Sequence, residues 1–313
     1  MEIWANNRAR VLVTEDCNLK CSYCHNEGQP FNKAKISDDL IHRIDELMKL
    51  SIKKNNGKKL DAITFSGGEP LLHKQLFNYI ETLSPHAKRS TLITNGVLLN
   101  KTKLNDIISS GITKIRLGVD SITNSTARPT KGNICNEKIL ERISLLLDNR
   151  HRIPFELNIV LSDFNNNQLD KLISFCCDNK ISAKFFELVR VKQFGDIGNE
   201  ALLQSQVSIP YNKFQNIIFS SYGSNILTLR NSEDMNEADK LFEGDGFTLR
   251  YCHFLCDYGL CYKTGTRIDA EGAVYTCMNR RGKLWISSIE PLQTSYNTII
   301  KANQERCIKC KSN

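Results

Sequence analysis

The sequence predicts an α/β protein, with a parallel sheet built from six strand–helix units followed by a small cysteine-rich region. Two observations indicate this. Up to about residue 200, short runs of apolar and β-branched residues alternate with amphipathic stretches of helical period, which is the pattern of repeated βα units. Beyond about residue 250, cysteines become frequent and segments with glycine turns replace the βα pattern.

Six apolar runs are predicted to be strands: Ala9–Thr14, Leu60–Phe65, Ser90–Thr94, Lys114–Val119, Phe155–Leu161 and Ala183–Leu188. The amphipathic stretches between them are predicted to be helices: Ser37–Ser51, His73–Leu83, Lys101–Ser109, Glu137–Asp148 and Asn166–Cys177. The first helix has a clear start, because Ser37 offers a capping hydroxyl and two aspartates follow it in the first turn. Gly111 stands where the third helix should end.

The βα pattern ends near residue 200. Tyr211–Tyr222 is predicted to be one more helix, and Asn231–Glu243 is polar and acidic. From Leu249 the chain is rich in cysteine, with hairpin-like segments around Gly265 and Gly272. We therefore expect two domains, residues 1–230 and residues 231–313.

Composition narrows the class of protein. The chain of 313 residues can bury a core without disulfides, and 41% hydrophobic with 24% charged residues is ordinary for a soluble globular protein. No apolar run approaches the roughly 20 residues that span a membrane, and the N-terminus has no signal-peptide core, so we expect a cytoplasmic protein. In that reducing compartment, 12 cysteines indicate metal or redox use. The net charge of +8 favours an anionic partner only weakly, and neither a membrane nor a nucleic acid is predicted as a partner.

The first motif is C-x3-C-x2-C, formed by Cys17, Cys21 and Cys24 just after the first predicted strand. Three thiolates on one short loop can ligate three irons of a [4Fe–4S] cluster and leave the fourth iron open to a small molecule. A zinc site is an alternative, with His25 as its fourth ligand. Unrelated buried thiols are another.

The second motif is Ser66-Gly-Gly-Glu-Pro70, directly after the second predicted strand. Gly67 and Gly68 allow a backbone to approach a ligand closely, and the Glu69 carboxylate can accept hydrogen bonds from an ammonium group. A Gly-Gly pair alone often marks only a turn. Its place one strand after the cysteine motif makes it a candidate binding segment.

These two motifs, with an aromatic residue just before the last cysteine, resemble the signature of the radical S-adenosylmethionine (SAM) superfamily. The resemblance implies a partial (β/α)6 barrel of the TIM type, with sites at the C-terminal ends of the strands. It implies that Cys17, Cys21 and Cys24 hold the catalytic cluster, whose open iron binds the amino and carboxylate groups of SAM. It also implies that SAM is lined by Tyr23, Gly67, Gly68, Glu69, Thr94, Asn95, Ser121 and Asn158, although such polar residues are also common as caps and turns.

The C-terminal cysteines form a third constellation. C-x10-G-x4-C, from Cys261 to Cys277, resembles the opening of the SPASM and twitch domains that extend many radical SAM enzymes, and the short ending of the chain fits the one-cluster twitch version. A second [4Fe–4S] cluster is then expected on Cys261, Cys277, Cys307 and Cys310, with Cys256 as a possible substitute ligand. A zinc ribbon is an alternative for the same thiols. The cysteines without metal spacing are expected to be packing residues: Cys135, Cys176 and Cys177.

Over nearly its whole length the chain resembles the GTP cyclase group of molybdenum-cofactor biosynthesis (MoaA-like). The supporting segments are Cys24–Gly28, Gly67–Leu71, Asn95–Gly96, Phe185–Leu188 and Arg267–Gly272. The chain departs from that group at Glu156, where the group has a lysine, and in its tail hairpin, where only Arg267 remains of several arginines. It also offers a fourth cysteine for the auxiliary cluster, where the group has three protein ligands.

The resemblance implies an enzyme that cleaves SAM reductively to methionine and a 5′-deoxyadenosyl radical, which abstracts a hydrogen atom from a bound substrate. The expected electron donor is a flavodoxin or ferredoxin. We expect the substrate to be a small anionic metabolite, nucleotide- or sugar-like, that is oxidised or cyclised. One alternative is cross-linking, thioether formation or oxidation in a ribosomally made peptide, which the absence of a leader-binding domain before the first strand disfavours. A zinc-binding module without catalysis is a second alternative.

Overall fold

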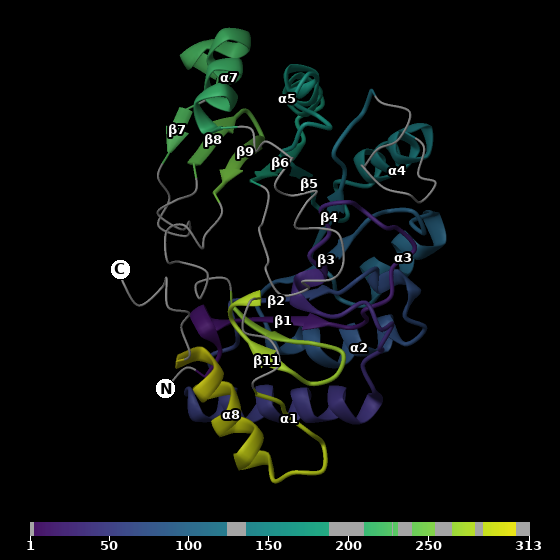
Figure 1. Ribbon diagram of the computed structural model, residues 1–313, viewed down its shortest axis with the longest axis vertical. Helices are drawn as coiled ribbons and strands as arrows, with labels where there is room; N and C mark the ends of the chain where they lie inside the picture. The colour runs from purple at the N-terminus through teal and green to yellow at the C-terminus, as the bar shows by residue number, and fades with distance from the viewer. Residues whose placement is uncertain are drawn as a thin grey trace.

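The protein, seen in a computed structural model, has one mixed sheet whose central part is parallel (Figure 1). The structure describes residues 3–123, 136–187, 210–226, 228–230, 240–253, 265–278 and 284–304. Within these ranges the sheet has 11 strands in the order β11-β10-β1-β2-β3-β4-β5-β6-β9-β8-β7. Figure 1 shows the helices following one another around the outside of the strands.

All six predicted strands are confirmed, and neighbouring pairs are parallel as expected. They are β1 (Arg8–Leu12), β2 (Ala62–Ser66), β3 (Ser90–Thr94), β4 (Lys114–Gly118), β5 (Phe155–Val160) and β6 (Ser182–Phe186). The helices after them also lie where expected: α1 (Asp38–Lys54), α2 (Leu76–Leu83), α3 (Lys101–Ser109), α4 (Asn136–Asp148), α5 (Leu169–Asp178) and α7 (Tyr211–Ile226).

The local signals for helix ends are confirmed. The Ser37 hydroxyl accepts a hydrogen bond from the Leu40 N–H at 3.2 Å, which caps α1. Gly111, just past α3, has a φ of +96°, a conformation that favours glycine. Helix α2 begins three residues later than predicted, because His73, which follows the 3₁₀ turn η3 (Pro70–Leu72), has an extended backbone with a ψ of 119°.

The sheet extends beyond the six predicted strands at both edges. β9 (Phe247–Cys252) pairs parallel with β6, and β8 (Lys240–Gly244) and β7 (Thr228–Arg230) continue antiparallel. At the other edge, β10 (Thr266–Ile268) pairs parallel with β1, and β11 (Val274–Tyr275) pairs antiparallel with β10. The hairpin around Gly272 is thus confirmed, but it forms part of the main sheet. The domain boundary near residue 230 stays a prediction, and the strands on both sides of it belong to one sheet.

The two faces of the sheet differ in polarity. Side chains alternate along a strand, and one set is apolar and fully buried under the helices, for example Val11, Ile63 and Leu157. The other face has charged or polar residues at the alternate positions, listed strand by strand as Arg10, Thr64, Thr91, Lys114, Arg116, Glu156 and Lys184. Parallel sheets buried on both faces are usually apolar on both. We call this polar side the inner face.

The last helix, α8 (Leu292–Gln304), packs against α1. Arg43 connects α1 to the segment just before α8. Its Nη2 donates to the carbonyls of Ser288 at 2.8 Å and Glu290 at 2.7 Å. None of the helices in the described ranges is long and apolar enough to cross a membrane.

Replacing Arg43 with alanine tests this junction. We expect Arg43→Ala to lower the free energy of unfolding by ~2–4 kcal/mol, since two carbonyls lose a charged donor in a buried setting. Lys53→Ala, at an exposed position on the same helix, should change it by less than about 0.5 kcal/mol. Urea denaturation followed by circular dichroism measures both, and equal effects of the two substitutions would contradict the assignment.

Candidate functional site

The loop with the first three cysteines lies between β1 and α1, at the C-terminal end of β1. It is held to its neighbours by backbone hydrogen bonds from Val13 N–H to the Ser66 carbonyl at 2.9 Å and from Glu15 N–H to the Ala34 carbonyl at 2.8 Å. Cys17, Cys21 and Cys24 are all partly exposed. The three residues are therefore partly open to solvent, while the backbone on either side is anchored.

The Gly-Gly turn after β2 lies directly against this loop. Gly68 N–H donates to the Thr14 carbonyl at 2.7 Å, and Glu69 N–H donates to the Asp16 carbonyl at 2.8 Å. A Cβ atom on Gly67 would lie 2.4 Å from the Thr14 oxygen, and one on Gly68 would lie 2.2 Å from the Asp16 oxygen. The close approach that requires these glycines is thus to the backbone of the cysteine loop itself.

Glu69 connects the turn to β3. Its buried carboxylate accepts hydrogen bonds from Leu71 N–H at 3.1 Å and from the Thr94 hydroxyl at 2.7 Å through Oε1, and from Asn95 N–H at 2.7 Å through Oε2. Two of the predicted site residues, Thr94 and Asn95, therefore donate hydrogen bonds to a third, Glu69.

Asn95 extends this network to the cysteines. Its side-chain Nδ2 donates to Asn18 Oδ1 at 2.8 Å and lies 3.7 Å from the sulfur of Cys17, as a donor to it. The backbone N–H of Leu19 also donates to that sulfur, at 3.4 Å. Two N–H groups thus point at the Cys17 thiol, and hydrogen bonds to cluster sulfurs are one means by which proteins set a cluster's reduction potential.

Tyr23 anchors the loop on the opposite side. Its hydroxyl hydrogen-bonds to Asp120 Oδ2 after β4, and Asp120 Oδ1 accepts from Val160 N–H at 2.8 Å. Tyr23 also packs with Cys21 and Val160. The C-terminal ends of β4 and β5 therefore contact the cysteine loop through one buried tyrosine.

The two remaining predicted residues lie farther along the same strand ends. Ser121 is buried and donates to Gln168 Oε1 at 2.8 Å, which is a structural contact within the chain. Asn158 belongs to the inner face of β5, two residues before Val160. Its Oδ1 is buried and has no hydrogen-bond partner in the part of the chain that the structure describes.

A charged group that sequence reasoning did not assign lies just after the cysteines. Glu27, in the 3₁₀ turn η2 (Asn26–Gly28), pairs with Arg10 of β1 and, at 3.2 Å, with Arg267 of β10. Burial acts to raise the pKa of Glu27, but the two guanidinium groups outweigh it and hold that pKa at about 2. The signal in the sequence was Arg10, a charged residue within an otherwise apolar strand. Such a charge indicates that one face of the strand does not pack into the apolar core.

A second charged group lies on β4, β5 and β6. Glu156 pairs with Arg116, with Lys114 at 3.2 Å and with Lys184 at 3.2 Å. Burial opposes its ionisation, but the three cations outweigh burial and keep the pKa of Glu156 well below its usual range. Burial, and then the charge of Arg116, lower the pKa of Lys184 to about 8. We call these four residues the Glu156 cluster.

One cysteine of the predicted C-terminal cluster site, Cys277, lies in the described ranges. Cys277 is buried beside Thr276, whose carbonyl accepts from Arg267 Nη1 at 2.7 Å. Four other predicted residues lie outside the described ranges: Cys256, Cys261, Cys307 and Cys310. Cys135 does too, whereas Cys176 and Cys177 are buried packing residues, as predicted. Among the described residues, no three Cys, His, Asp or Glu side chains are grouped as a single metal ion would need.

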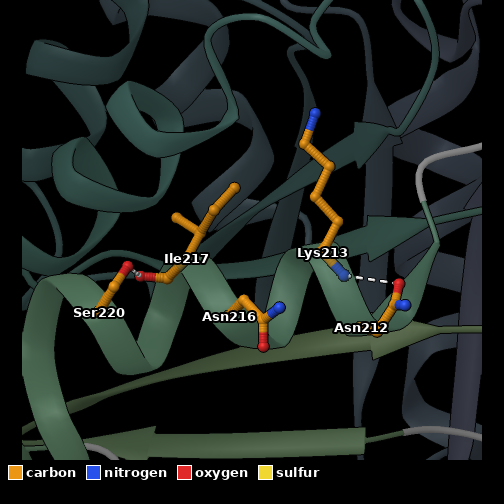
Figure 2. Close-up of a pocket in the computed structure, with 5 residues that line it drawn as sticks. All are labelled: Asn212, Lys213, Asn216, Ile217 and Ser220. Carbon is orange, nitrogen blue, oxygen red and sulfur yellow. Dashed lines mark hydrogen bonds between the residues drawn. The ribbon is translucent and has the colours of Figure 1, made fainter.

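A shallow hollow on α7 is separate from all these residues (Figure 2). One helix alone lines it, with Asn212, Lys213, Asn216, Ile217 and Ser220. Lys213 is already engaged, since its Nζ donates to the Asn166 carbonyl at 3.3 Å. The hollow contains none of the predicted site residues.

Adding a methyl group at Gly68 tests the contact between the turn and the loop. We expect Gly68→Ala to push the Asp16 backbone away, which would cost about 1–3 kcal/mol of stability and raise the alkylation rate of Cys17, Cys21 and Cys24 in the metal-free protein. Gly57→Ala is the control, since Gly57 has open space around it. Iodoacetamide labelling read by peptide mass spectrometry measures the rates. Unchanged labelling in Gly68→Ala would show that the turn does not hold the loop.

Comparisons with known proteins agree with this geometry. The family model for the radical SAM superfamily matches residues 11–176. The GTP 3′,8-cyclase of Clostridium perfringens (strain 13 / Type A) is 26% identical over 204 residues, covering 62% of this chain and 60% of the cyclase. The GTP 3′,8-cyclase of Petrotoga mobilis is 25% identical over 279 residues, covering 86% of this chain and 80% of the cyclase. This chain thus spans only about three fifths of the Clostridium relative.

Among solved structures, SuiB of Streptococcus suis bound to S-adenosylmethionine has a TM-score of 0.63 at 13% identity, covering 92% of this chain and 65% of SuiB. That likeness confirms the predicted fold class, and the named relatives confirm the resemblance to the GTP cyclase group. Enzymes of this superfamily use a [4Fe–4S] cluster and SAM. Because the family model matches just over half of its length, the chain belongs to the radical SAM superfamily of enzymes.

Proposed function

We propose that this enzyme binds SAM at a [4Fe–4S] cluster held by Cys17, Cys21 and Cys24, and removes a hydrogen atom from a small anionic metabolite. The single observation that supports this most is the anchored loop of three partly exposed cysteines at the C-terminal end of β1. The surroundings fit such a group. Asn158 Oδ1 on the inner face and the Ser22 hydroxyl in the loop are buried acceptors without a partner in the described ranges.

When bound, the cluster supplies an electron that cleaves SAM to methionine and a 5′-deoxyadenosyl radical, which takes a hydrogen atom from the substrate. The protein's own residues bind SAM and fix the position of the cysteine loop. Glu69, positioned by three hydrogen bonds, offers carboxylate oxygens to an ammonium group. Asn95 donates to the Cys17 sulfur, and Tyr23 fixes the loop against β4 and β5. Buried apolar residues behind them exclude water from the strand ends.

The charge of the inner face supports an anionic substrate. Arg10, Arg267, Arg116 and Lys184 all belong to it and outnumber the carboxylates that pair with them in the described ranges. Positive charge gathered on one face attracts anions and raises their local concentration. Oxidation or cyclisation of such a metabolite is the reaction we propose.

Peptide modification is a second candidate, since SuiB, with the same fold, has been solved bound to its precursor peptide SuiA. Assay of the same reduced enzyme with small anionic metabolites and with peptides distinguishes the two, because only the true substrate should be consumed in proportion to the 5′-deoxyadenosine formed.

We also propose a second [4Fe–4S] cluster on Cys261, Cys277, Cys307 and Cys310, with Cys256 as the substitute ligand. Four thiolates complete the ligation of such a cluster. The burial of Cys277 next to the Arg267 contact supports a site close to the inner face.

SAM cleavage is the direct test. Anaerobically reconstituted protein with dithionite should form 5′-deoxyadenosine from SAM, and Cys17→Ala should abolish it because one iron loses its thiolate. Cys177→Ala, at a buried packing position, should retain it. Liquid chromatography of the products measures the yield. If the unsubstituted protein holds iron yet forms no 5′-deoxyadenosine, the assignment fails.

Metal content tests the second cluster. The reconstituted protein should bind about eight irons, and Cys277→Ala should bind about four, since two four-iron clusters are proposed. The absorbance near 400 nm should fall in proportion. Zinc in place of iron at the C-terminal cysteines, found by elemental analysis of anaerobically purified protein, would favour the zinc ribbon.

A further inference from the structure

We propose that Arg116 and Lys184 bind the anionic group of the substrate, and that Glu156 restricts this group to a low charge, such as one carboxylate or one phosphate. The inference rests on the proposed function, because it assigns a substrate class to the same inner face. It also separates this chain from enzymes whose substrate has a polyphosphate.

The position of the Glu156 cluster relative to the cysteine loop supports a substrate site. Val160, Asn158 and Glu156 follow one another on the inner face of β5, and Val160 packs against Tyr23, which also contacts Cys21. At about 3.3 Å per residue, Glu156 lies roughly 13 Å deeper than Val160. A small metabolite with its anionic group at the cluster would thus have its other end near the cysteine loop, with the unpartnered Asn158 oxygen between them.

The contacts define which cations are available. Lys184 and Arg116 have side chains that are 15% and 21% exposed, so both keep some surface that Glu156 does not cover. Lys114 is 38% exposed. It is the first residue of β4 and therefore lies at the opposite end of that strand from the cysteine loop. Arg250 of β9 pairs in register with Lys184 and adds further positive charge.

The charges in the cluster do not cancel. Three cations share one carboxylate, which leaves an excess of positive charge in a partly buried site. An incoming anion can neutralise this excess, and a guanidinium suits carboxylate or phosphate oxygens. The same carboxylate repels every additional negative charge on the ligand at short range. Glu156 therefore admits an anion of low charge and opposes a triphosphate.

A purely structural role for the cluster makes a different prediction. If the four residues only fill the interior, an added anion should not bind there, and removal of Glu156 should only destabilise the fold. If they form a binding site, removal of Glu156 should improve binding of polyanions. Affinity measurements distinguish these roles.

The experiment uses reconstituted enzyme with SAM, kept anaerobic in a buffer without phosphate. Inorganic phosphate, acetate and tripolyphosphate are titrated separately by calorimetry, so that phosphate and carboxylate chemistry are told apart. We expect phosphate or acetate to bind the unsubstituted enzyme at one site, with tripolyphosphate binding no more tightly. Glu156→Gln should tighten tripolyphosphate binding about tenfold or more, because the repelling charge is gone. Glu81→Gln, which removes an exposed surface charge on α2, should change nothing.

A second variant covers the case in which Glu156→Gln does not fold. Lys184→Met keeps the side chain's length and leaves Glu156 paired with Arg116 and Lys114, and it should weaken phosphate and acetate binding about tenfold. Equal affinities in Lys184→Met and the unsubstituted enzyme would overturn the inference, as would equal responses of Glu156→Gln and Glu81→Gln. These titrations do not depend on radical chemistry. A failure of SAM cleavage would refute the proposed function, whereas the titrations alone decide whether the Glu156 cluster binds an anion.

Discussion

The contact between the Gly-Gly turn and the cysteine loop is the constraint on which the site depends. The Gly68 and Glu69 N–H groups donate to carbonyls of Thr14 and Asp16, at a separation that leaves no room for a Cβ atom. From this contact the network continues through the Glu69 carboxylate to Asn95, and from Asn95 to the sulfur of Cys17. Three successive strand ends thereby determine where the first cysteine lies.

The two faces of the sheet that supports this network differ in what they contribute to stability. Helices bury the apolar face, which supplies the hydrophobic stabilisation. The inner face instead contains ion pairs, and burying charges in this way gives little net stability, since desolvation offsets the Coulombic gain. An apolar interior would pack as well or better. The charged inner face is therefore best explained by binding, which agrees with its position below the cysteine loop.

The sequence predicted the parts of this fold that depend on local pattern. Apolar runs located all six central strands, and Ser37 and Gly111 located helix ends. β9 was missed, and so was the pairing of the Gly272 hairpin with β1, because both depend on pairing with strands distant in sequence. For the site, the motifs located the cysteines and Glu69, but the ion partners of Glu156 lie on two other strands, β4 and β6, and no local pattern indicates such a register. The sequence analysis explained Gly67 and Gly68 by close approach to a ligand. In the structure, close approach to the backbone of the cysteine loop requires them.

Glu27 shows why the C-terminal segment cannot be treated as a separate appendage. It follows Cys24 by three residues and pairs with Arg10 of β1 and Arg267 of β10, so one carboxylate joins the cysteine loop to strands from both ends of the chain. Arg267 in turn donates to the Thr276 carbonyl, next to Cys277. One arginine and one glutamate therefore connect the residue before Cys277 to the turn that follows the first cysteine loop.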